Sequence, residues 1–128
     1  MAEIIFLTLA EVIDIHTDQI ERYGGSHGIR DMNLLSSAVA TPSASFGGAY
    51  LHADIYEMAA AYAFHIAQNH PFIDGNKRAA LASAMVFLEM NGNGISDSAG
   101  WLYDAMIGIA SAKLGKAEFA DILRKLQR

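Results

Sequence analysis

The stretch Asn69–Arg78, NHPFIDGNKR, lies between two strongly apolar runs, Met58–Ala67 and Ala79–Leu88. Each run is far shorter than the ~18–20 residues needed to cross a bilayer, so we expect two core helices. The second helix should run from about Gly75 to Met90. It is apolar on nearly all sides, which predicts a central position in the fold. Asn69–Asp74 is then a tight loop that leads into this central helix.

Cap and turn signals on either side predict further helices. Thr8-Leu9-Ala10-Glu11 has the pattern of a capping box, and Asp31 can cap a second helix. The Ser/Gly-rich segment Pro42–Leu51 can form a short hairpin around Gly47-Gly48. The remaining expected helices run over about Thr8–Arg22, Asp31–Ala40, Asp54–Gln68, Ser98–Ala112 and Lys116–Gln127. The sequence therefore predicts an all-α fold, a compact bundle of about six helices around one central apolar helix, in a single domain over residues 1–128.

Several remaining side chains are assigned to the core. His65 falls on a largely apolar helix, where a hydrogen-bonded core histidine is the simplest interpretation. Trp101, Tyr103 and the six methionines are assigned to the core as well. His16, His27, His52 and His65 show no spacing that is typical of metal ligands.

Composition excludes several classes of function. Hydrophobic residues make up 52% of the 128 and charged residues 18%, which is typical of a folded globular protein. The absence of cysteine excludes a disulfide scaffold, a thiolate zinc site and a cysteine nucleophile, and it fits a reducing cytoplasm. The net charge of −5 argues against direct binding to nucleic acid or to an anionic membrane. The segment Met1–Leu7 lacks the basic start of a secretion signal, so we expect a cytoplasmic protein.

Positive charge is scarce in the middle of the chain and is concentrated beside the loop. Between Asp31 and Ala112 the only Lys and Arg residues are Lys77 and Arg78. They fall in the first turn of a helix, where the dipole disfavours cations by a few tenths to ~1 kcal/mol. A bound anion would make this placement of the two cations favourable, because free N–H groups, the dipole and both side chains would then face one negative ligand. Gly75 lets backbone approach that ligand closely, so the pattern predicts a phosphate cradle.

Two further residues beside the cradle are able to do chemistry. Asp74 is a natural Mg²⁺ ligand, since Mg²⁺ takes one or two carboxylates and completes its shell with phosphate oxygens and water. His70 is the only residue of the segment that can accept a proton near neutral pH. A base, a metal ligand and an anion clamp fit transfer of a phosphorus-containing group to a hydroxyl.

Each of these residues also has a structural interpretation. His70 can be a connecting-loop histidine, Asp74 an N-cap, and Lys77-Arg78 a solvated helix end. The residues alone leave both interpretations open.

The motif resembles the signature of the Fic/Doc family. His70-Pro71-Phe72-Ile73-Asp74-Gly75-Asn76-Lys77-Arg78 matches it position by position, and three shorter segments agree in order and spacing. These are Arg22-Tyr23-Gly24-Gly25, Gly28-Ile29-Arg30-Asp31 and Asn91-Gly92. The likeness therefore covers nearly the whole chain.

Lys77 and Leu81 distinguish the branches of this family. Members that transfer AMP usually have Gly at the first position and Arg at the second, so the chain is similar to the Doc (death-on-curing) branch. This resemblance implies a toxin and kinase that uses ATP and Mg²⁺ to phosphorylate a threonine of translation elongation factor Tu, which arrests translation. Gly75 stands where Doc proteins often have Ala, which keeps Fic-type AMP transfer as the alternative. A non-catalytic binding module of the same fold is a third hypothesis.

The resemblance also implies a role for each motif residue. His70 would be the base, Asp74 the Mg²⁺ ligand, and Phe72 a buried pin for the loop. The phosphates of ATP would contact Gly75, Asn76, Lys77 and Arg78.

The resemblance extends to regulation. Phe46–Tyr50 lies where the family has a flap that docks the target as an added strand. The inhibitory motif of many Fic proteins has no full match here, since Thr17–Glu21 is followed by Arg22. Inhibition is therefore expected from a small antitoxin whose C-terminal helix fills the active-site groove.

Overall fold

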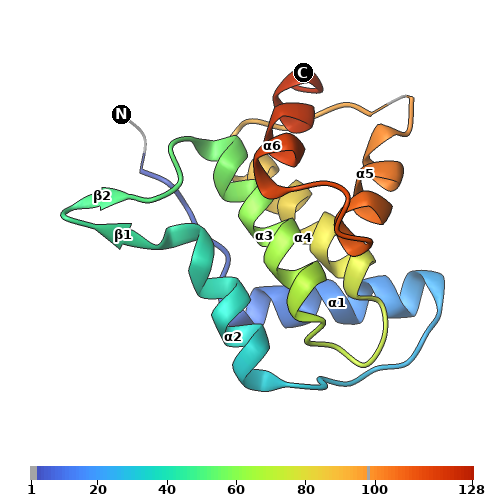
Figure 1. Cartoon of the computed structure of the whole chain (residues 1–128). Coiled ribbons are helices and arrows are strands. Elements are labelled where there is room, and N and C mark those ends of the chain that lie inside the picture. Colours follow the sequence, from blue (N-terminus) through green and yellow to red (C-terminus); the bar gives the residue numbers. More distant parts are fainter. Residues whose placement is uncertain (1–2, 98) are drawn as a thin grey trace.

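Two alanine-rich helices, α3 (Ile55–Asn69) and α4 (Asn76–Met90), lie side by side in the middle of the computed structural model, which describes residues 3–97 and 99–128 (Figure 1). Both helices bury small side chains, which let packed backbones approach closely. The fully buried small residues include Ala59, Ala60 and Ala63 on α3 and Ala80, Ser83 and Ala84 on α4.

The other helices surround this pair. α1 contacts α4, and α2 contacts α3 on the side from which the hairpin projects (Figure 1). α5 and α6 cover the opposite side of α3. Their bounds are α1 Leu9–Tyr23, α2 Met32–Ala40, α5 Trp101–Ala110 and α6 Lys116–Lys125. The predicted all-α bundle of about six helices is confirmed.

The predicted starts of α1, α2 and α3 are confirmed by their caps. Thr8 Oγ1 accepts a hydrogen bond from the Glu11 amide while the Glu11 carboxylate accepts one from the Thr8 amide, which completes a capping box. Asp31 and Asp54 accept from the third residue of α2 and α3 in the same way.

The predicted hairpin is also confirmed. Strands β1 (Ser45–Phe46) and β2 (Ala49–Tyr50) pair antiparallel, with Ser45 opposite Tyr50. Gly47 and Gly48 both have positive φ, 60° and 83°, as a two-residue hairpin turn of the favoured hand requires. The hairpin projects away from the helices (Figure 1), and Phe46 at its tip is 82% exposed.

The structure corrects two details of the core. α3 is the more enclosed of the two central helices, because it packs against α2, α4, α5 and α6, whereas Val86 and Glu89 of α4 face solvent. Trp101 and Tyr103 are not core residues: their exposed fractions are 51% and 72%. Both lie on the outer side of α5, whose inner side buries Leu102, Ala105, Met106 and Ile109.

Two smaller differences concern the start of α5 and one methionine. α5 begins at Trp101, not at Ser98, because Gly100 adopts a left-handed conformation with φ 76° just before it; Ser98 itself lies outside the described residues. Met32 is exposed, unlike the buried Met58 and Met106. Within residues 3–97 and 99–128, no helix combines the length and apolar character that a membrane span needs.

Candidate active site

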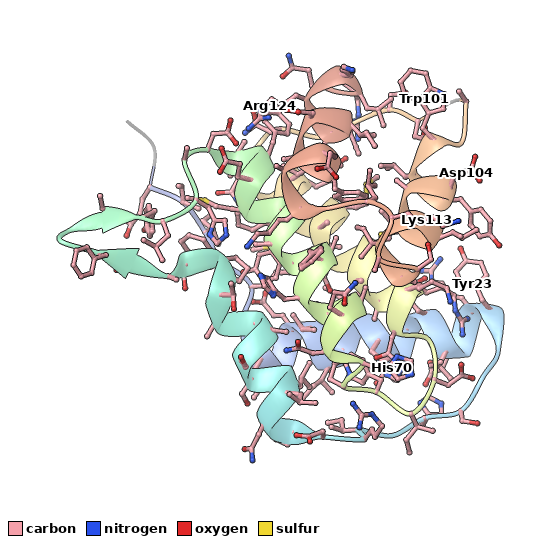
Figure 2. All side chains as sticks on the ribbon, in the orientation of Figure 1. Tyr23, His70, Trp101, Asp104, Lys113 and Arg124 are labelled. Atoms are coloured by element: carbon pink, nitrogen blue, oxygen red, sulfur yellow. The ribbon has the colours of Figure 1, made fainter. Side chains whose placement is uncertain are left out.

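The loop between α3 and α4 begins at His70, which has an unusual backbone conformation. His70 ends α3 with φ 52° and ψ 51°, the left-handed region that residues other than glycine seldom adopt. Arg30 holds this conformation in place, because its Nε donates to the His70 carbonyl oxygen at 2.6 Å and its Nη2 to that of Asn69 at 3.0 Å. The His70 backbone is thus fixed at both ends while its side chain is exposed (Figure 2).

A backbone pairing attaches the rest of the loop to the segment after α1. Ile29 and Phe72 form an antiparallel bridge. The amides of Arg30 and Asp31 both donate to the Pro71 carbonyl, and the Ile73 amide donates to Gly28. Phe72 is fully buried, as expected of a pin that holds the loop on the core.

Asn76 closes the loop from the other side. Its Oδ1 accepts from the Phe72 amide and its Nδ2 donates to the Phe72 carbonyl, both at 2.9 Å, and the side chain is buried. The amide group of Asn76 is therefore used to hold the loop. Its remaining route to a bound anion is the backbone N–H in the first turn of α4.

Asp74 lies at the mouth of the site and is held as an ionised carboxylate. Backbone amides of Ser26 (3.1 Å) and Gly75 (2.8 Å) donate to it and lower its pKa, and the charge of Arg78 acts in the same direction. It does not cap α4, because the N-cap is Gly75 and no side chain accepts there. The approach of Ser26 needs a glycine beside it: a Cβ at Gly25 would lie 2.7 Å from Asp74 Oδ2.

Lys77 and Arg78 occupy the first turn of α4, as predicted. Among the described residues, no ion pair involves either of them. Arg78 Nη1 donates to the Gln19 carbonyl at 3.3 Å, which steadies the half-buried guanidinium. Two cations without carboxylate partners at an uncapped helix N-terminus form a site that attracts anions.

These side chains meet at one cavity of about 400 Å³. Its wall contains every site residue predicted from the sequence, together with two alanines and one isoleucine. The lining residues are Ala67, His70, Ile73, Asp74, Gly75, Asn76, Lys77, Arg78 and Ala110. A second, more apolar hollow of about 270 Å³ adjoins it across Lys77 and Arg78 and is lined by Leu81, Tyr103, Met106 and Ile107.

One residue of this region was missed by sequence reasoning. His16 of α1 is 3% exposed, and its Nε2 lies 2.7 Å from the Asp74 carbonyl oxygen. Burial lowers its pKa, and this outweighs the hydrogen bond to Asp74, so the ring is neutral at neutral pH. The signal in the sequence was its place on the buried stripe between Val12 and Ile20.

The residues present fit Mg²⁺ and a nucleotide phosphate chain. Asp74 supplies one ionised oxygen ligand beside a polar cavity, which is the donor set that Mg²⁺ shares with phosphates and water. Gly75, with φ 75°, has the left-handed conformation that favours glycine, and a Cβ there would lie 3.0 Å from Ile20 Cδ1 and 3.3 Å from Arg78 Nη2. Lys77 and Arg78 supply the positive charge.

Comparison with known proteins extends these observations. Residues 6–88 match the model of the Fic/DOC family. The chain is 35% identical over 116 residues to "Protein kinase doc" of Escherichia phage P1, which covers 91% of this chain and 90% of that protein. It is 40% identical over 79 residues to "Toxin Doc" of Mycolicibacterium smegmatis, covering 62% of this chain and 61% of the other. The family match runs from before α1 almost to the end of α4 and contains the whole cavity motif.

Proposed function

The chain belongs to the Fic/Doc family, and we propose that it is a kinase toxin of the Doc branch. Its reaction is transfer of the γ-phosphoryl group of ATP to a threonine hydroxyl of translation elongation factor Tu. One observation carries the proposal: a single cavity brings an exposed histidine, an ionised carboxylate and two cations without carboxylate partners together at a helix N-terminus.

His70 takes the role of general base. Its backbone is held by Arg30 and by the end of α3, whereas its ring faces the cavity and has no hydrogen-bond partner among the described residues. It accepts the proton of the threonine hydroxyl as the oxygen–phosphorus bond forms. The bond from the γ-phosphorus to its bridging oxygen breaks, and ADP leaves with that electron pair.

The first turn of α4 stabilises the phosphates. The N–H groups of Asn76, Lys77 and Arg78 have no intrahelical partner, and both cationic side chains stand beside them. Asp74 would hold Mg²⁺, which neutralises charge on the phosphate oxygens when bound. Because the pKa of Asp74 is lowered, its carboxylate is already ionised at neutral pH and would bind the ion without first losing a proton.

Lys77 and Leu81 favour phosphoryl transfer over AMP transfer. Lys77 lines the phosphate cavity with a charged side chain where AMP-transferring relatives have glycine. Leu81, one turn later, lines the adjoining apolar hollow and provides no second cation for a further phosphate. Gly75 is the feature that favours AMP transfer, so this reaction is the second candidate.

Labelled nucleotide separates the candidates. Purified protein is incubated with elongation factor Tu and Mg²⁺, with ATP labelled at either the γ- or the α-phosphorus. We expect label on the factor from γ-labelled ATP alone. Label from α-labelled ATP would establish AMP transfer instead. Absence of both, together with no binding of ATP in calorimetry, would establish a non-catalytic module.

Regulation is proposed to come from a partner protein. An antitoxin helix would occupy the cavity and displace ATP, as in toxin–antitoxin pairs in the cytoplasm. The hairpin, with Phe46 exposed at its tip, would dock the target by strand addition. Deleting Phe46–Tyr50 should then raise KM for elongation factor Tu while KM for ATP stays the same.

A further inference from the structure

His16 lies on α1, far from the loop motif in sequence, yet it contacts two residues of that motif. Its ring stacks on Phe72 with 3.8 Å between ring centroids and 2° between planes. Its Nε2 lies 2.7 Å from the Asp74 carbonyl oxygen. We propose that His16 is a positioning residue that fixes the Asp74–Gly75 turn; the effect expected on catalysis rests on the proposed function.

The hydrogen bond determines which nitrogen of His16 carries the proton. A carbonyl oxygen only accepts, so Nε2 must donate. No other donor to this carbonyl is found among the described residues. If His16 lost its Nε2–H, the carbonyl would lose its one protein partner at a site where Asp74 must hold its orientation.

The carbonyl and the carboxylate belong to the same residue, and this links His16 to the ligand site. The Asp74 carboxylate accepts hydrogen bonds from the amides of Ser26 and Gly75, and the Asp74 carbonyl accepts one from His16. These three bonds fix both the backbone rotation and the side-chain direction of Asp74. They also fix Gly75, the N-cap of α4.

α1 is a suitable support for this contact. Val12, His16 and Ile20 are buried at four-residue intervals, so His16 is packed between two core residues on one face of the helix. The same helix supplies the Gln19 carbonyl to Arg78. Helix α1 therefore contacts both Asp74 and Arg78, and its position affects the placement of both residues.

Two variants divide the contact into its parts. His16→Phe keeps an aromatic ring against Phe72 and removes the donor, whereas His16→Gln keeps a donor and removes the ring. Val12→Ala is the matched control, because it removes packing from the same buried face of α1 and Val12 has no hydrogen-bonding side chain. All three are compared in the full chain.

The first readout needs no nucleotide. In ¹H–¹⁵N spectra of the free protein, we expect the Ser26 and Gly75 amide protons to shift upfield in His16→Phe, because their bonds to Asp74 lengthen. The amide of Phe87, in the core of α4, should not shift. In His16→Gln and Val12→Ala the Ser26 and Gly75 signals should stay near their original positions.

The second readout is the Mg²⁺ dependence of phosphoryl transfer. His16→Phe should raise the half-saturating Mg²⁺ concentration about tenfold, the equivalent of one lost hydrogen bond, and His16→Gln should restore it to within about threefold. Two results would overturn the positioning role. One is unchanged Ser26 and Gly75 amide signals in His16→Phe, and the other is a rise in half-saturating Mg²⁺ concentration in Val12→Ala equal to that in His16→Phe. Because the spectra require no activity, an inactive wild-type protein would refute the proposed function and leave this test intact.

Discussion

The guanidinium of Arg30 donates from Nε to the main-chain carbonyl of His70 at 2.6 Å, across a separation of 40 residues. The same side chain donates to Asn69, so it covers the last carbonyls of α3. It holds the left-handed turn, with φ 52°, that directs the His70 ring to the cavity. Arg30 thus controls the placement of the proposed base without touching the reacting groups.

Arg30→Ala should therefore lower kcat more than it raises KM for ATP. Loss of a charge-assisted hydrogen bond removes about 1.5–3 kcal/mol where it acts, which corresponds to at least about tenfold in rate. Steady-state kinetics with varied ATP measure both constants. Arg22→Ala is a matched control, since its partner is the exposed Asp18. Equal kcat in Arg30→Ala and wild type would show that the left-handed turn at His70 keeps its conformation without Arg30.

His70→Ala should abolish growth arrest while the fold persists. The ring is exposed, so its removal costs little packing, and Arg30 holds the left-handed backbone through the His70 carbonyl, which the substitution keeps. We expect the free energy of unfolding to change by no more than about 0.5 kcal/mol. Induced expression tests toxicity, and thermal melting tests the fold. A folded variant that still arrests growth would remove His70 from the base role.

The sequence allowed prediction of the fold because local signals agreed with tertiary structure. Thr8, Asp31 and Asp54 each cap the helix that they were predicted to start. Trp101 and Tyr103 were misassigned because α5 is apolar on both sides, and periodicity does not show which side faces the core. The exact start of α5 depended on the left-handed Gly100.

The site was predictable only where it is contiguous in sequence. All six predicted residues line one cavity because they belong to one loop and the first turn of one helix. The supports of that loop come from elsewhere: His16 lies 58 residues from Asp74, and Arg30 lies 40 from His70. Pairing of segments 28–31 and 71–73 creates these contacts, and no local pattern encodes such a pairing.

Lys77→Gly should reduce phosphoryl transfer clearly, by ten- to about a hundredfold, because a charge-assisted phosphate contact of about 1.5–3 kcal/mol is lost. Any AMP transfer that appears should be slow, since Leu81 supplies no second cation. Parallel assays with γ- and α-labelled ATP measure both reactions. Lys113→Gly, on the exposed segment after α5, is the control for loss of one positive charge. Full phosphoryl transfer by Lys77→Gly would show that Lys77 does not determine the branch.

Mild acid should destabilise the fold through a histidine–lysine cluster away from the cavity. Lys116 Nζ lies 3.2 Å from His52 Nε2 and 3.0 Å from His65 Nε2, and Glu57 is the acidic group near Lys116 and His52. Burial first, then the charges of Lys116 and His52, lower the pKa of His65 to about 4. The unfolded chain therefore binds this proton at higher pH than the folded chain does.

The stabilisation by neutral His65 is complete above about pH 6.5 and is lost as the pH falls towards about 4. We expect the free energy of unfolding to fall by about 1–2 kcal/mol. This is less than the whole pKa difference would give, because the His65 ring is only partly buried. Urea unfolding at pH 7 and pH 4.5 measures it. The free energy of unfolding of His65→Gln should fall less between these two pH values. An equal fall in both proteins would assign the acid sensitivity to other groups.

The intact mass of elongation factor Tu, measured after incubation with ATP, Mg²⁺ and the purified protein, tests the central claim most directly. We predict that wild-type protein adds the mass of one phosphoryl group, on a threonine, and that His70→Ala and Asp74→Asn add nothing. Addition of an AMP group by the wild type, or no added mass from a protein that binds ATP and arrests growth, would contradict the proposed reaction.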